Sequence, residues 1–383
     1  MVQYNFPTIM LSGEGSLKAF CAYLEAKNHR KTLIVTDRVL NDLGIVENLT
    51  NLLSSCGMEY EIFTDTHPNP IEEDVEKGVD AYKKGNCDSI IGFGGGSPID
   101  VAKVVKIMVS HEPPLRQYDD ELGGDKLIVN PMPSLYAIPT TSGTGSEVGR
   151  SGVIIVKETG RKTIFFHPDL MPEVAVLEPM LTESMPPHLT AASGIDALVH
   201  CLEAYFVPSF HPMADGIALQ GMELVLQWLP KAFKNGKDID ARSKMQVAAS
   251  MGATAFQKGL GLIHSIAHPL SSMYDLHHGL ANALALPDSV KFLENSDLDE
   301  TGRKKISIVN DMLIKNGYTQ KSLSQNLRSF IIDQGIEMGL SKYDIKSEDF
   351  DKIIGEILAD PCHAGSMIPV TRDDFLEVIK KAY

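Results

Sequence analysis

Long apolar runs, an excess of positive charge and an export signal are all lacking in this chain of 383 residues. No run of 18 apolar residues occurs, which argues against a membrane-spanning helix. The start, Met1-Val2-Gln3-Tyr4, has no basic segment followed by an apolar stretch, so we expect no export. The formal net charge of -15 disfavours binding to nucleic acid or to an anionic membrane. These absences favour a cytoplasmic protein that acts on small molecules.

Closely spaced cysteines are lacking too. The five cysteines are Cys21, Cys56, Cys87, Cys201 and Cys362. They are scattered, odd in number and without CxxC spacing, so no disulfide framework is implied. We therefore expect reduced thiols, as in a cytoplasmic protein.

What is present is an ordinary globular composition, with 43% hydrophobic and 22% charged residues. In the first half, β-branched runs at 32–36, 60–63 and 89–93 are each followed by a helical pattern. This βαβ order predicts an α/β domain built on a parallel, Rossmann-like sheet. Ligands of such sheets bind at the carboxyl ends of the strands.

The second half has a different pattern. From about Met185 the chain shows long amphipathic segments, such as 214–233 and 241–258, without a clear strand signal. Pro186-Pro187 marks a plausible boundary. We therefore predict an α/β domain over 1–185 and an all-helical domain over 186–383.

Five potential metal ligands lie in the second half. Asp196 and His200 stand four residues apart, as do His264 and His268, and His278 follows ten residues later. On a helix, side chains at i and i+4 point the same way. Buried helical histidines usually only pack, but this many correctly spaced groups in apolar stretches would be costly to bury without a metal or another partner. Three imidazoles and a carboxylate suit Fe2+, with Zn2+ as the alternative, at a catalytic site.

A glycine-rich turn follows the third predicted strand. Residues 94–100 read Gly-Gly-Gly-Ser-Pro-Ile-Asp and run into a helical segment. Glycines let the backbone approach a pyrophosphate, and the start of a helix offers unpaired N–H groups. The alternative is a plain βα turn, and the motif is not the GxGxxG fingerprint. Residues 139–148 form a second cluster of hydroxyls and glycines, which suits a nucleotide or simply a turn.

Asp37 stands at the end of the first predicted strand. An acidic side chain there can bind ribose hydroxyls and repel the extra phosphate of NADP, which would favour NAD. Asp37 is equally well placed to cap a helix that begins at Arg38.

Together these motifs resemble the iron-containing alcohol dehydrogenases. The resemblance extends from Gly13-Glu14-Gly15-Ser16 to the segment 264–283 and so covers nearly the whole chain. It implies a dinucleotide-binding α/β domain, an all-helical metal-binding domain and NAD in the cleft between them. The metal ligands it implies are Asp196, His200, His264 and His278. By the same resemblance, His268 relays protons.

The resemblance also implies a set of cofactor contacts. They are Asp37 at the adenosine ribose, Asn69, Gly95, Gly96 and Ser97 at the pyrophosphate, Thr140, Thr141 and Thr144 at the nicotinamide side, and Lys162. Many members carry an Asn-Pro-Arg element near the C-terminus, whereas here Ala364-Gly365-Ser366-Met367-Ile368-Pro369 follows Asp360-Pro361-Cys362-His363. We expect Cys362 to be a packed thiol.

The activity implied is hydride transfer between a primary alcohol or its aldehyde and NAD(H), in a homo-oligomer that is at least a dimer. Segments 150–154, 160–162 and 256–261 are similar to 4-hydroxybutyrate dehydrogenases, so a hydroxy acid is a further candidate substrate. Arg150 is then either an anchor for the substrate carboxylate or part of a structural ion pair. The alternatives are a metal- and NAD-dependent lyase of the dehydroquinate synthase type and a non-catalytic nucleotide or metal binder.

Overall fold

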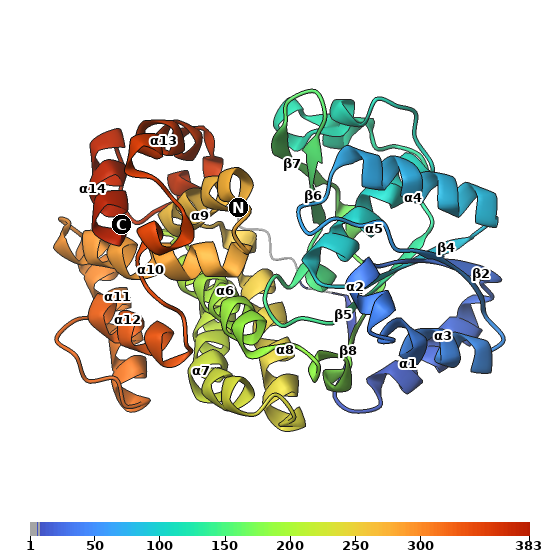
Figure 1. The fold of residues 1–383 in the computed structure, drawn as a ribbon, viewed down its shortest axis with the longest axis horizontal. Coiled ribbons are helices and arrows are strands. Elements are labelled where there is room, and N and C mark those ends of the chain that lie inside the picture. Colours follow the sequence, from blue (N-terminus) through green and yellow to red (C-terminus); the bar gives the residue numbers. More distant parts are fainter. Residues whose placement is uncertain (1–5, 7) are drawn as a thin grey trace. The chain divides into compact units, whose positions relative to one another are not determined.

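The computed structural model describes residue 6 and residues 8–383, which divide into two compact units. One unit comprises Phe6–Thr141 and Gly145–Glu183 and contains every strand of the described chain. The other comprises Ser184–Tyr383 together with Ser142–Thr144. Figure 1 labels the elements of both units.

The first unit is built on a parallel sheet. Its strands follow the order β1-β8-β5-β4-β2-β3, and every pairing between them is parallel. They are β1 (Ile9–Ser12), β2 (Lys31–Val35), β3 (Glu59–Phe63), β4 (Ser89–Gly94), β5 (Ser134–Pro139) and β8 (Val174–Leu177). The predicted α/β class with a parallel sheet is therefore confirmed.

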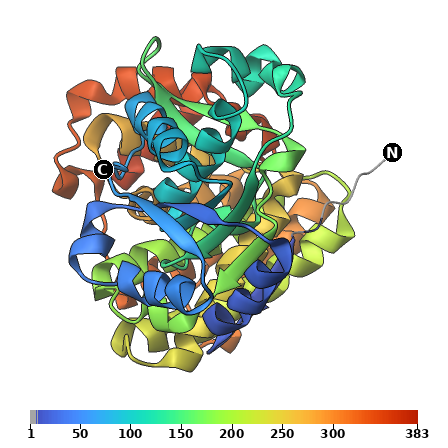
Figure 2. The same cartoon turned by 90° about the vertical axis from the view of Figure 1, so that its right-hand side faces the viewer.

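Helices cover both faces of this sheet because successive side chains of a strand point to opposite faces. In β2, Ile34 packs with α1 (Ser16–Lys27) and α3 (Val46–Ser55). Its neighbours Leu33 and Val35 pack on the opposite face. That face is covered by α4 (Glu72–Gly85) and α5 (Gly96–Met108), and Figure 2 shows the sheet from another side. The short helix α2 (Arg38–Asp42) follows β2.

An antiparallel hairpin lies outside the predicted strands. It pairs β6 (Ser151–Val156) with β7 (Arg161–Phe166), and Gly160 with φ +64° lies at its turn. Ile154, Val156 and Phe165 of the hairpin are buried in the core beside α5. Alternating burial along β6 is the period-two pattern of a strand with one face on a core.

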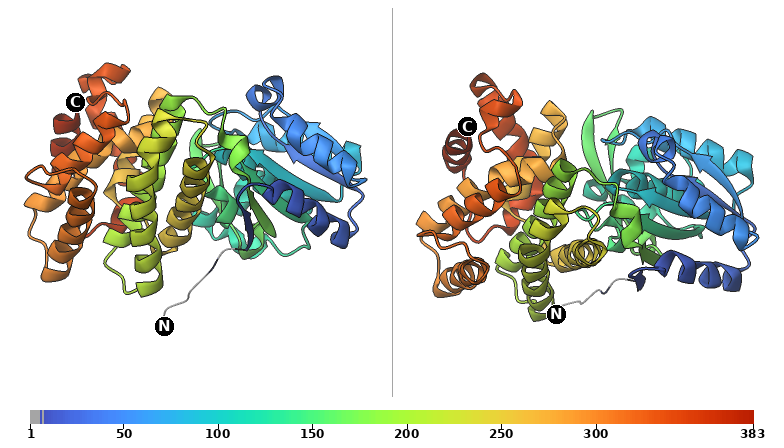
Figure 3. Two further views of the ribbon diagram at one scale, coloured as in Figure 1. Left: turned by 90° about the horizontal axis from the view of Figure 1, so that it is seen from below. Right: turned by 60° about the horizontal axis from the view of Figure 1, so that its bottom comes forward.

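The second unit contains no strand within residues 184–383. Its helices are α6 (Pro187–Phe206), α7 (Pro212–Lys234), α8 (Ile239–Ala255), α9 (Leu262–Tyr274), α10 (His278–Asn295), α11 (Glu300–Lys315), α12 (Leu323–Asp333), α13 (Phe350–Ala359) and α14 (Arg372–Ala382). Figure 3 shows them in green to red. The predicted all-helical second half is confirmed. Among the residues described here, no helix is both long and apolar enough to cross a bilayer.

The expectation of five reduced thiols is wrong for one pair. Cys21 in α1 and Cys56 at the end of α3 form a disulfide, with their Cα atoms 6.1 Å apart. Cys87, Cys201 and Cys362 are free. The pairing has no sequence motif because it depends on α1 and α3 packing together on one face of the sheet. That packing brings together two positions 35 residues apart.

Candidate functional site

Helix α6 carries the first two candidate metal ligands. Asp196 and His200 lie one turn apart on this helix, and both side chains are buried, with relative exposures of 2% and 5%. Pro187 at the first turn suits a helix start because its missing N–H would have no helical partner there. The helix is buried along most of its length, so its polar side chains face protein rather than water.

The other two ligands come from α9 and α10. His264 lies in the first turn of α9, and His278 begins α10. Gly279 brings α10 against α6, because a Cβ at this position would overlap the carbonyl oxygen of Ala192 and lie 3.0 Å from Cβ of Asp196. A glycine is therefore needed beside His278 for the helices to meet here.

The four side chains meet at one place. Ligand atoms of Asp196, His200, His264 and His278 all lie within 4.8 Å of one another. Oδ1 of Asp196 is 3.6 Å from Nε2 of His278 and 3.9 Å from Nε2 of His200. The amide nitrogen of Asn282 donates to Oδ1 of Asp196 at 2.8 Å and lies 3.4 Å from Nε2 of His264 and 3.3 Å from Nε2 of His278. The lone pairs of three ligands therefore converge on one point.

Burial keeps the central imidazoles neutral. It lowers the pKa of His200 to about 4 and that of His264 to about 3, since a charged ring is poorly solvated in the interior. Neutral imidazole is the form that binds metals, and one carboxylate with three such rings is a donor set for Fe2+ or Zn2+. The residues present therefore fit a divalent metal, and this cluster is a candidate metal site.

Glu203, which the sequence analysis missed, holds His264 in place. Its carboxylate accepts a hydrogen bond from Nδ1 of His264 at 2.6 Å and from the backbone N–H of Ile263 at 2.7 Å. Nδ1 of His264 is thus the protonated nitrogen, and Nε2 keeps the lone pair that faces the cluster. Burial raises the pKa of Glu203 to about 7. The sequence did contain a signal for this residue, because Glu203 is a glutamate in the apolar helical stretch that carries Asp196 and His200. The i, i+4 spacing of metal ligands did not include it.

We expect Glu203→Gln to weaken metal binding about 10–100-fold, because the amide no longer fixes the tautomer of His264. The dissociation constant for Zn2+, measured by competition with a chromogenic chelator, checks this. Glu223→Gln is the matched control, since Glu223 lies on α7 and its carboxylate meets Lys315 at the surface. Equal Zn2+ affinity of the Glu203→Gln variant and the unmodified protein would refute the role of Glu203.

His268 lies one turn after His264 but has a separate partner. Its Nδ1 is 2.6 Å from Oδ2 of Asp360, whose other oxygen accepts from Oγ of Ser265 at 2.7 Å and from the backbone N–H of Cys362 at 2.9 Å. The ring of His268 stacks on that of His278, with centroids 5.3 Å apart. His268 therefore borders the cluster without being among its four ligands.

Asp360 also positions the segment that follows α13. This segment forms a short turn at Pro361–Gly365 that lies against α9. Cys362 is half-buried there, and burial raises the pKa of its thiol well above the ordinary value. A protonated thiol in this position is consistent with the expected packed cysteine.

The predicted cofactor contacts lie mostly at one edge of the parallel sheet. Each of the strands β2, β3, β4 and β5 is followed in the chain by one group of these residues. In the same order, the groups are Asp37, Asn69, the turn 95–97 and the pair 140–141. These four strands are neighbours and run in parallel, so the residues that follow them lie at the same carboxyl edge. Oγ of Ser97 donates to the carbonyl oxygen of Pro68 at 2.6 Å, which ties the loop of Asn69 to the glycine-rich turn.

The glycine-rich turn has the conformation that a close backbone approach needs. Gly94 has φ +150°, and a Cβ there would lie 2.7 Å from Cγ of Pro98. Helix α5 begins at Gly96 and directs its first N–H groups to the sheet edge. The turn therefore fits a pyrophosphate, because the start of a helix favours anions.

Asp37 caps α2, as one of its two interpretations predicted. Its carboxylate accepts from the backbone N–H of Leu40 at 2.9 Å, and burial raises the pKa of Asp37. Lys162 lies in β7, and its charge partly offsets the effect of burial, which raises the pKa of Asp100. Thr144 belongs to the segment that groups with the helical unit. Arg150 stacks over the ring of Phe166 at 5.2 Å.

Comparison with known proteins identifies the family. The profile of the iron-containing alcohol dehydrogenases matches residues 7–179, and the profile of the C-terminal domain of the same family matches residues 190–383. The chain belongs to the iron-containing alcohol dehydrogenase family. It is therefore a member of an oxidoreductase family, and the resemblance found in the sequence is confirmed.

Individual relatives span the whole chain. It is 36% identical to a 4-hydroxybutyrate dehydrogenase of Cupriavidus necator over 92% of both chains, and 31% identical to an NAD-dependent methanol dehydrogenase of Bacillus methanolicus over 100% of both. Among solved structures, a 1,3-propanediol oxidoreductase superposes with a TM-score of 0.91 at 29% identity, covering 100% of both chains. An alcohol dehydrogenase from Oenococcus oeni gives 0.92 at 29% identity with the same coverage. None of these matches supports the lyase or non-catalytic alternatives.

Proposed function

We propose that this protein interconverts a primary alcohol and its aldehyde with NAD(H), using a divalent metal held by Asp196, His200, His264 and His278. The observation that carries the proposal is the convergence of these buried side chains, with ligand atoms within 4.8 Å of one another. Family membership supports the same reaction class. Fe2+ is the metal expected from the family, and Zn2+ suits the same donors.

The proposed domain roles follow from where the two sets of residues lie. We assign dinucleotide binding to residues 1–185 and metal binding to residues 186–383. The NAD contacts are those predicted above, namely Asp37, Asn69, Gly95, Gly96, Ser97, Thr140, Thr141, Thr144 and Lys162. The parallel sheet edge and the start of α5 support this assignment.

Two carboxylates of the protein orient the histidines that this reaction needs. When bound, the metal would lower the pKa of the alcohol oxygen and the nicotinamide would accept the hydride. Glu203 holds the proton of His264 on Nδ1, so that Nε2 faces the cluster. Asp360 holds Nδ1 of His268 in the same way, which leaves Nε2 of His268 to take up and pass on the alcohol proton.

The substrate proposal is narrower. The 4-hydroxybutyrate dehydrogenase and methanol dehydrogenase relatives both act at a primary alcohol, so we propose an unbranched primary alcohol, with an ω-hydroxy acid included in the range. NAD is proposed over NADP because Asp37 places a carboxylate at the end of β2. We also propose a cytoplasmic homodimer.

An absorbance assay of NADH tests the function. Metal-free protein is reloaded with Fe2+ under anaerobic conditions, or with Zn2+, and offered simple alcohols, diols and 4-hydroxybutyrate with NAD+ or NADP+. We expect NADH to form in proportion to aldehyde, only in metal-loaded protein, and faster with NAD+ than with NADP+. Turnover that is equal with and without metal would overturn the proposal.

A further inference from the structure

A second chemically distinct cluster lies in the α/β unit, apart from the residues assigned above. It comprises the disulfide of Cys21 and Cys56 and the side chain of Glu25, whose Oε1 is 4.0 Å from Sγ of Cys21. Both cysteines are half-exposed. A disulfide at the surface can be reached by other thiols, whereas one in a core cannot.

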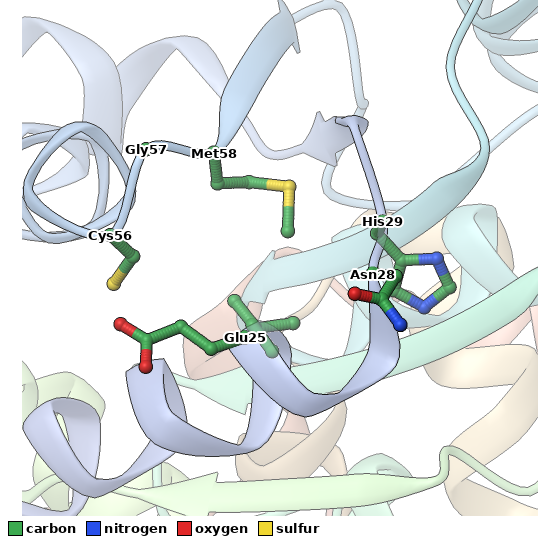
Figure 4. A pocket seen from close by; sticks show the side chains of 7 residues that line it. Glu25, Asn28, His29, Cys56, Gly57 and Met58 are labelled. Atoms are coloured by element: carbon green, nitrogen blue, oxygen red, sulfur yellow. The ribbon is translucent and has the colours of Figure 1, made fainter.

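A cavity of about 330 Å³ opens beside this cluster. It is lined by Leu24, Glu25, Asn28, His29, Cys56, Gly57 and Met58. Figure 4 shows the sulfur of Cys56 directed towards the carboxylate of Glu25 at this cavity. Cys56 is part of the lining and Cys21 is not. The cavity therefore gives a small molecule access to one sulfur of the pair in particular.

We propose that Cys21 and Cys56 form a reversible thiol–disulfide exchange site that reacts with low-molecular-weight thiols through Cys56. The incoming thiolate attacks Sγ of Cys56, the sulfur–sulfur bond breaks, and its electron pair passes to Sγ of Cys21, which takes up a proton. A second thiol then displaces the first from Cys56. Two thiols are thereby oxidised to one small disulfide, and the protein gains two thiols.

The charge of Glu25 slows reduction of the disulfide. Its carboxylate lies within 4.8 Å of both sulfur atoms, so it repels a thiolate that approaches either of them. The same charge opposes a thiolate on the leaving sulfur of Cys21, and a poorer leaving group makes the disulfide more durable. Glu25→Gln is therefore expected to speed reduction about fivefold, as for one unit charge near 4 Å in water.

The exchange has a structural consequence within the α/β unit. The closed loop runs from Cys21 to Cys56 and contains β2, the cap at Asp37 and α2. Its two ends also meet through Phe20 and Leu24 of α1 and Leu49 and Leu53 of α3, which are buried together. Reduction should therefore leave the fold intact while releasing a covalent constraint on the segment that carries Asp37.

Counting thiols in denatured protein tests the pairing without any substitution. After incubation with glutathione disulfide we expect three reactive thiols, those of Cys87, Cys201 and Cys362. After incubation with excess reduced glutathione we expect five, the full number in the chain. Cys362→Ser is the control and should lower both counts by one. Five thiols under oxidising conditions would overturn the proposal.

Single substitutions test which sulfur is attacked. Cys21→Ser leaves Cys56 alone at the cavity and should form a mixed disulfide with glutathione, seen by mass spectrometry of the intact protein. Cys56→Ser leaves Cys21, which does not line the cavity, and should react more slowly. Equal rates for the two variants would refute attack through Cys56, and the thiol count of the unmodified protein decides the pairing even if a variant fails to fold.

Discussion

Replacing His264 with alanine is expected to abolish metal retention and alcohol oxidation together. His264 is 1% exposed, and its Nε2 faces the cluster because Nδ1 is bound to Glu203. Without this ring the metal has three protein ligands and a cavity in place of the fourth. Loss of Lewis-acid stabilisation worth several kcal/mol lowers kcat/KM by about a thousandfold or more. Metal content by plasma mass spectrometry and NADH formation are the two measurements.

His268→Ala is the matched comparison one helical turn away. It removes the ring that is bound to Asp360 but none of the four clustered ligands. We expect this variant to keep its metal and to lose about 100-fold in kcat, the size of one general acid–base contribution. Equal metal loss in the two variants would instead place His268 among the ligands.

Lys103→Met is expected to lower the free energy of unfolding of the α/β unit by about 3–5 kcal/mol, because it breaks a buried ionic network. Lys103 lies in α5 with its side chain fully buried. Its ammonium donates to the carbonyl oxygens of Ser146 and Ser151 at 2.7 and 2.8 Å and to Oγ of Ser146 at 2.8 Å. Burial lowers its pKa to about 8.

The carboxylate of Asp100 increases the destabilisation expected when the charge of Lys103 is removed. Its carboxylate lies 3.9 Å from the ammonium and accepts from Oγ of Ser146 at 2.6 Å and from the backbone N–H of Val153 at 3.1 Å. Removing the lysine takes the nearest cation from a half-buried carboxylate, which then keeps only the more weakly acting charge of Lys162. The helix after the glycine-rich turn would then be held less firmly to the segment 146–153.

Two measurements check the Lys103→Met prediction. Thermal unfolding followed by circular dichroism should show a midpoint lowered by about 10 °C, and hydrogen exchange should speed up in peptides that cover 146–156. Lys77→Met is the control, because Lys77 is largely exposed and 3.9 Å from Asp65 at the surface. A midpoint shift no larger than that of the control would show that Lys103 is not a structural cation.

Helical spacing made five candidate ligands visible in the sequence, and the resemblance to the family selected four of them. Asp196 with His200 and His264 with His268 share the i, i+4 separation that puts side chains on one face. The partners of the histidines were not predictable in this way. Glu203 is separated from His264 by 61 positions in the sequence, and Asp360 from His268 by 92. These side chains come into contact only because of how α6, α9 and the turn after α13 pack.

Strands β2, β3 and β4 were predicted from β-branched runs, whereas β1, β8 and the hairpin of β6 and β7 were not. The alternating pattern of β6 was not recognised as a strand, because this segment was interpreted as a family motif around Arg150 that is followed by a turn at Gly160. At Asp37, residue type alone allowed two roles, and the structure shows the helix cap. The disulfide escaped prediction because only the packing of α1 on α3 brings Cys21 and Cys56 together.

The metal site is tested most directly by a crystal structure of Zn2+-loaded protein, with anomalous scattering measured at the zinc edge. We predict one anomalous peak about 2.0–2.2 Å from a carboxylate oxygen of Asp196 and from Nε2 of His200, His264 and His278. A second group in the helical unit, His268 with Asp360 and Cys362, also has the side chains to bind zinc. A peak at that group, with none at Asp196, would contradict the proposed metal site.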